Sequence, residues 1–113
     1  MSPREWKLRI ADMITAIQKV LDYIEGLDLE DFATDDKTMD AVIRNLGIIG
    51  EAAVHVPWPM REAHPEIPWR QMTEMRNFVI HVYFGISTKT LWETITGDLP
   101  PLIPLLEEVL REE

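Results

Sequence analysis

The stretch DDKTMDAVIRNLGIIGEAAVH, residues 35–55, carries the clearest fold signal in the chain. Its apolar side chains recur every three or four residues, which predicts one buried stripe on an amphipathic helix. This stripe consists of Met39, Val42, Ile43, Leu46, Ile49, Ala53 and Val54. Gly47 and Gly50 fall inside the helix, where each costs up to about 1 kcal/mol relative to alanine. We therefore expect another helix to pass close to these glycines.

The residues before this stretch show the same spacing. Ser2 and Pro3 provide a capping hydroxyl followed by proline at the first helical position, and Gly26 is a good C-terminal stop. These signals predict a helix over residues 3–25. Its apolar stripe consists of Trp6, Ile10, Met13, Ile14, Ile17, Leu21 and Ile24.

An acidic segment, LDLEDFATDD, separates the two helices at residues 27–36. It shows no periodicity, so we expect a connection without regular structure. Thr34 or Asp35 can cap the helix that follows, because both side chains can accept a hydrogen bond from its first backbone N–H groups.

Prolines divide the segment after residue 56. Four of them lie within residues 57–68, which predicts a connector with one short helical turn at residues 60–64. The next helix is expected from Pro68 to about Phe84, where Gly85 stops it.

The C-terminal part of the chain predicts one more helix with a break in it. Ser87 or Thr88 can cap this helix, and Gly97 followed by two prolines interrupts it before the apolar run resumes at Leu102. No strand pattern is present. The sequence therefore predicts a single all-α domain over residues 1–113, an antiparallel bundle of four to five helices.

Composition limits the function classes. The 113 residues are 46% hydrophobic and contain no cysteine, so a disulfide framework or a thiolate metal site is excluded. No stretch approaches the roughly 20 apolar residues of a membrane span, and we expect a soluble cytoplasmic protein without a membrane partner. The net charge of −9 argues against avid non-specific binding of nucleic acid, but it leaves room for a small basic site.

Four polar side chains interrupt the apolar stretch MRNFVIHVYFG, residues 75–85: Arg76, Asn77, His81 and Tyr83. Burying them unpaired is costly, so they either satisfy one another in the core or form a site. On an α-helix, Asn77 and His81 share one face and Arg76 and Tyr83 share another. Arg76 and His81 then point roughly 140° apart, which favours a site completed by a second subunit.

These residue types suit the cleavage of a phosphate ester. His81 can serve as general base or acid near neutral pH, Asn77 could hold its tautomer, and Arg76 could stabilise a phosphoryl transition state. RNA supplies its own nucleophile, the 2′-hydroxyl, so no metal or other cofactor is required. In the alternative interpretation, His81 is an ordinary helix histidine and Arg76 pairs with a core carboxylate such as Glu51.

The motif Arg76-Asn77-x3-His81-x-Tyr83 resembles that of the HepT-like branch of the HEPN superfamily. The resemblance covers nearly the whole chain. It includes AVIRNLGIIGEAA at residues 41–53, HPEIPWRQMTEMRN leading into the motif, and LWETITGDLPPLIPLL near the C-terminus.

This resemblance implies a HEPN-like bundle that dimerises and joins two motifs in one cleft. It implies a metal-independent ribonuclease acting as the toxin of a toxin–antitoxin pair, with Arg76 and His81 as catalytic residues and RNA as substrate. It also implies a cognate MNT-type nucleotidyltransferase as antitoxin, which silences the toxin by transferring AMP to Tyr83.

Other residues receive supporting or structural roles. Arg44 and Glu51 also match the family pattern, and Glu51 could orient Arg76 or pair with Arg44. His55 and His64 are expected on the surface rather than as metal ligands. The four tryptophans are expected to anchor the core or an interface, although Trp58 or Trp69 could stack on a base. The alternative function is a non-catalytic helical dimer that binds a nucleotide or a partner protein.

Overall fold

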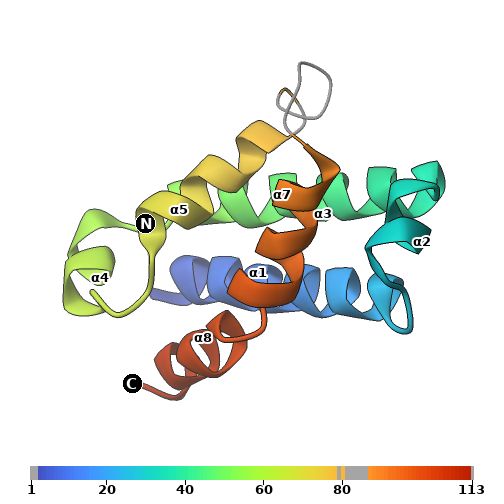
Figure 1. The fold of residues 1–113 in the computed structure, drawn as a ribbon. Coiled ribbons are helices and arrows are strands. Elements are labelled where there is room, and N and C mark those ends of the chain that lie inside the picture. The colour runs from blue at the N-terminus through green and yellow to red at the C-terminus, as the bar shows by residue number, and fades with distance from the viewer. Residues whose placement is uncertain (1–2, 79, 81–86, 113) are drawn as a thin grey trace.

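Two long antiparallel helices form the base of the fold, and shorter helical segments pack around them (Figure 1). A computed structural model describes residues 3–78, 80 and 87–112. The long helices are α1 (Pro3–Ile24) and α3 (Asp36–Val54). Every regular element in this part of the chain is helical, which confirms the predicted all-α fold.

The predicted apolar stripes of α1 and α3 pack against each other along most of their length. Fully burying one such side chain stabilises the fold by about 1.5–3 kcal/mol. Gly26 has a φ of 80°, a left-handed conformation that glycine adopts without strain, and it ends α1 as predicted. The completely buried side chains of the pair include Ile10, Met13, Ile17, Val20, Val42, Leu46 and Ile49.

The acidic segment after α1 contains a helix that its sequence did not predict, α2 (Leu29–Ala33). Asp28 starts it, because its carboxylate accepts from Asp31 N–H at 2.8 Å while the Asp31 carboxylate accepts from Asp28 N–H at 3.2 Å. Phe32 is fully buried, and its ring centroid lies 5.2 Å from that of Trp92. A five-residue helix is too short for periodicity, so this tertiary contact decides its structure.

The proline-rich connector contains α4 (Trp58–Ala63), which overlaps the predicted turn at residues 60–64. It leads to α5 (Trp69–Glu74), which begins directly after Pro68, where a helix start was predicted. The expected surface position of His64 is wrong, because this residue is only 6% exposed. Its Nε2 lies 3.1 Å from Glu112 Oε2, and its Nδ1 lies 3.3 Å from Glu66 Oε1. These contacts tie the connector to the C-terminal end of the chain.

The tryptophans divide into two groups. Trp6 and Trp69 are buried and Trp92 is half-buried, which agrees with a role as core anchors. Trp58 is 66% exposed, so it is no core anchor of this chain.

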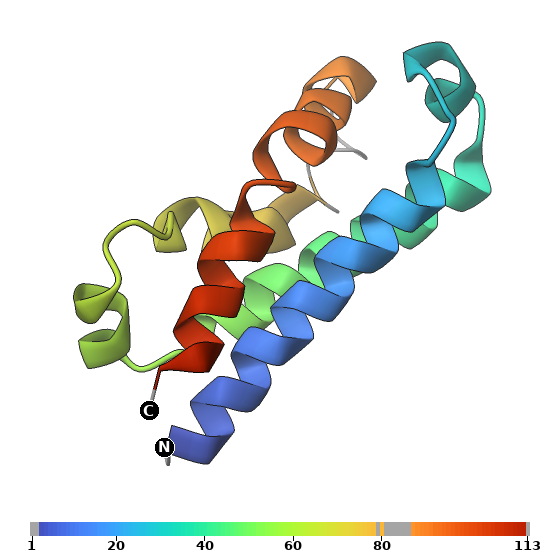
Figure 2. The ribbon, with the colours of Figure 1, turned by 90° about the horizontal axis from the view of Figure 1, so that it is seen from below.

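The C-terminal arm consists of α7 (Thr88–Glu93), η2 (Thr94–Asp98) and α8 (Leu102–Arg111). Ser87 caps α7, as one of the two predicted candidates, and η2 is a wider π-helical turn at the predicted break. Beyond the break, α8 packs along α1 (Figure 2). Among the described residues, no helix is long and apolar enough to cross a membrane.

Candidate functional site

Gly50 brings the backbone of the motif directly onto α3. A Cβ atom at this position would lie 2.6 Å from the backbone N of Arg76 and 2.8 Å from its Cβ. It would also lie 3.0 Å from the backbone O of Thr73. Only glycine permits this approach, so the predicted close passage of another helix is confirmed at Gly50. At Gly47, by contrast, no described atom lies within 4 Å of such a Cβ.

The side chain of Arg76 extends from this contact toward Glu51. Its Nη1 lies 3.4 Å from Glu51 Oε2, and the two side chains are 46% and 60% exposed. Exposed pairs of this kind contribute about 0–1 kcal/mol, so the contact orients the guanidinium more than it stabilises the fold. Glu51 was expected either to orient Arg76 or to pair with Arg44, and in the structure it contacts Arg76. The arginine is half-exposed, which does not fit a purely structural, buried pair.

His55, which was expected only on the surface, also contacts Glu51. It is exposed, but its Nδ1 lies 2.9 Å from the backbone O of Glu51 and 3.7 Å from Glu51 Oε1. A carbonyl only accepts, so the neutral ring carries its proton on Nδ1 and leaves the lone pair on Nε2. The Glu51 carboxylate therefore lies between Arg76 and His55. The four-residue spacing of Glu51 and His55 on one helix could have revealed this pairing.

Arg76 and Asn77 lie in η1 (Met75–Asn77), a 3₁₀ turn that follows α5. The predicted uninterrupted α-helix to Phe84 is therefore wrong at this point. A 3₁₀ turn advances about 120° per residue instead of about 100°, so the expected angle of roughly 140° between Arg76 and His81, which assumed an uninterrupted α-helix, stays an expectation. The turn coincides with the contact on Gly50, where α3 constrains the backbone.

The remaining predicted site residues are not all described. Asn77 and Arg44 are both exposed, and Arg44 has no ion pair with any described residue. His81 and Tyr83 fall outside the described residues, and their roles stay predictions. The structure thus brings together Arg76, Glu51 and His55.

The sequence of this chain is similar to those of known proteins. A family model described as ribonuclease HepT-like matches residues 13–109. A protein of Thermococcus cleftensis named "Probable ribonuclease HepT" is 43% identical over 96% of this chain and 98% of its own length. A candidate RNase of Caldanaerobacter subterraneus is 37% identical over 83% of this chain and 84% of its own. No solved structure gives a significant match. The extent of these matches shows that the chain belongs to the HepT-like ribonuclease family.

Proposed function

We propose that this chain is a metal-independent endoribonuclease that acts as the toxin of a toxin–antitoxin pair. Membership of the HepT-like family supports ribonuclease activity. The position of Arg76 is the observation that best supports the proposal. Its backbone packs against Gly50, and its half-exposed guanidinium contacts Glu51. An exposed ion pair costs little to exchange, so the guanidinium can turn from Glu51 to an incoming phosphodiester.

In the proposed reaction, His81 removes the proton from an RNA 2′-hydroxyl. The 2′-oxygen then attacks the adjacent phosphorus, the bond to the 5′-oxygen breaks, and that oxygen takes up a proton from solvent. The products are a 2′,3′-cyclic phosphate and a 5′-hydroxyl. Arg76 stabilises the extra negative charge on the phosphoryl oxygens in the transition state, and Asn77 orients the His81 ring.

The second part of the proposal concerns control. A cognate MNT-type nucleotidyltransferase transfers AMP to the Tyr83 hydroxyl and releases pyrophosphate from ATP. The attached group adds bulk and a negative phosphodiester near Arg76, which repels an RNA backbone at short range. Incubation with the partner enzyme, ATP and Mg²⁺ should add the mass of an adenylyl group (AMP less one water) to wild type and none to Tyr83→Phe. Equal labelling of this variant would place the acceptor elsewhere.

The catalytic proposal is tested by RNA digestion in the presence and absence of EDTA. Arg76→Ala and His81→Ala should each lose about 10²–10⁴-fold in cleavage rate while keeping the circular dichroism spectrum of wild type. Arg111→Ala is the matched control, since Arg111 is an exposed arginine whose ion pair is with Glu108. Full cleavage by both folded variants would instead support the alternative of a non-catalytic binding dimer.

A further inference from the structure

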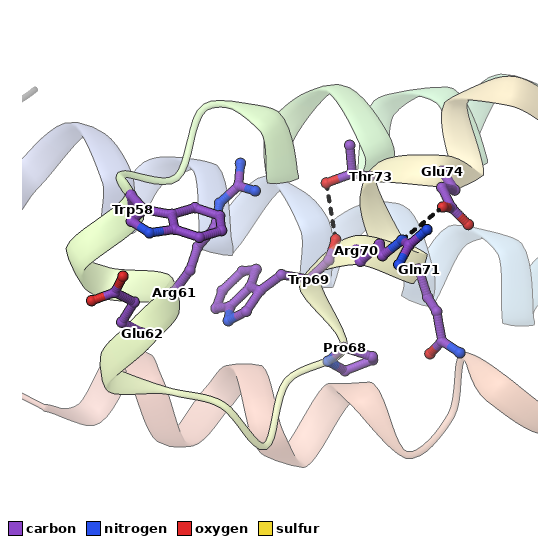
Figure 3. Close-up of a pocket in the computed structure, with 9 residues that line it drawn as sticks. All are labelled: Trp58, Arg61, Glu62, Pro68, Trp69, Arg70, Gln71, Thr73 and Glu74. Carbon is purple, nitrogen blue, oxygen red and sulfur yellow. Dashed lines mark hydrogen bonds and ion pairs between the residues drawn. The ribbon is translucent and has the colours of Figure 1, made fainter.

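A groove of about 730 Å³ lies between α4 and α5 (Figure 3). It falls within the size range of small-ligand sites. The indole rings of Trp58 and Trp69 line the groove, and Gln71 and Glu74 contribute from α5. The proposed phosphate chemistry uses none of these side chains.

Trp58 is exposed, and its neighbours restrain it. At 66%, it is more exposed than any other large hydrophobic side chain in the described part of the chain. Pro57 and Pro59 flank it, and each proline fixes its own backbone φ. The guanidinium carbon of Arg61 lies 5.6 Å from the centre of the Trp58 ring.

Arg61 is itself anchored at the C-terminal end of α3. Its guanidinium donates to the backbone O of Ala53 at 2.7 Å, of Val54 at 3.0 Å and of Val56 at 3.0 Å. These bonds add side-chain donors to the carbonyls at the end of the helix and fix the position of the guanidinium. The indole thus packs against an anchored cation. Stacking of a flat ligand on it would therefore cost the Trp58 side chain little conformational entropy.

The charge distribution makes this surface more favourable for binding nucleic acid than the rest of the molecule. Residues 52–80 contain three arginines and three glutamates, so the entire net charge of −9 resides elsewhere. A polyanion therefore meets less repulsion from α4, α5 and η1 than from the acidic remainder of the chain, even with Glu51 beside Arg76. The Gln71 amide can both donate to and accept from the edge of a base.

The groove also reaches the segment of the chain that leads into the candidate site. Thr73 and Glu74 line its end, and the backbone of Thr73 contacts the same point on Gly50 as Arg76 does. We propose that the groove binds one base of a single-stranded RNA, stacked on Trp58, while the strand continues toward Arg76. The choice of RNA as the ligand rests on the proposed ribonuclease function.

The test is direct binding of a labelled single-stranded 2′-O-methyl RNA, whose blocked 2′-oxygen prevents cleavage. Base–aromatic stacking is worth about 1–3 kcal/mol, so Trp58→Ala should weaken binding about 5- to 150-fold. Trp58→Phe should recover part of this loss. Tyr23→Ala, at a second exposed aromatic residue on α1, should bind as wild type does.

An abasic position moved along the oligonucleotide identifies the stacked base. One abasic position should weaken binding by wild type about as much as Trp58→Ala does. The same abasic position should not weaken binding by the Trp58→Ala variant any further. Unchanged binding by Trp58→Ala, or no binding by wild type, would overturn the inference. If Trp58→Ala changed the oligomer mass, Trp58 would lie in a protein–protein interface, and this would also overturn the inference. Failure of wild type to cut ordinary RNA, with Trp58-dependent binding intact, would refute the ribonuclease but keep the base site.

Discussion

At the scale of single residues, the position of the candidate site depends on Gly50. The sequence predicted that a helix passes close to this glycine, because glycine in a helix interior is otherwise destabilising. It could not show that the approaching atoms belong to Arg76, since that contact joins residues 26 positions apart. The pairing of His55 with Glu51 was within reach of the sequence, but histidine on an exposed helix end carries no distinctive signal.

Alanine at the two interior glycines of α3 should have opposite effects. Gly50→Ala places a methyl group against the Arg76 backbone, so it should lower the free energy of unfolding by about 1–3 kcal/mol and reduce RNA cleavage. Gly47→Ala meets no described atom and should raise the free energy of unfolding by about 0.5–1 kcal/mol. Urea unfolding of both variants measures these effects. Equal stability of the two variants would show that the contact on Gly50 is not tight.

At the scale of elements, the sequence predicted the long helices but missed two of the short segments, α2 and η1. Residues 3–25 were predicted for α1, which ends at Ile24, because several turns of periodic apolar residues average out local ambiguity. The five residues of α2 and the three of η1 offer no such averaging. Both depend on tertiary contacts, of Phe32 with Trp92 and of Arg76 with Gly50, that no local pattern encodes.

The N-terminal cap of α3 should make a pH-dependent contribution. Hydrogen bonds from the Thr38 side chain and backbone lower the pKa of Asp35 below its ordinary value of 3.8. A lowered folded-state pKa stabilises the fold above the unfolded pKa, and this contribution is lost as the pH falls through the folded value. Asparagine also caps well but does not titrate. The difference in unfolding free energy between wild type and Asp35→Asn should therefore be constant near neutral pH and shrink below about pH 4. A difference independent of pH would exclude this contribution.

At the scale of the whole molecule, side chains far apart in the sequence join the two ends of the chain. Glu112 accepts from Lys7 Nζ through its backbone O at 2.7 Å, and its carboxylate contacts His64. Both chain ends lie on the same side of the molecule (Figure 2). The burial of His64 was unpredictable, because its partner Glu112 is 48 positions away. The predicted bundle was correct in class because it required only amphipathic helices.

A site completed by a second subunit, as the sequence predicts, requires a dimer. Light scattering at micromolar concentration should give about twice the chain mass of 13.1 kDa. The angle between Arg76 and His81 that first favoured a dimer assumed an uninterrupted α-helix, which η1 interrupts, so the measured mass tests the dimer without relying on that angle. A clean monomer that cleaves RNA would show that one chain holds the complete site.

The central claim is metal-free cleavage through His81 and Arg76, and the chemistry of the RNA ends tests it most directly. Wild-type protein in excess EDTA should convert a defined single-stranded RNA into fragments with 2′,3′-cyclic phosphate and 5′-hydroxyl ends, as measured by mass spectrometry. His81→Ala should yield such fragments at least about 100-fold more slowly. Fragments carrying 5′-phosphate ends, cleavage abolished by EDTA, or unchanged fragment yield from folded His81→Ala would contradict the account.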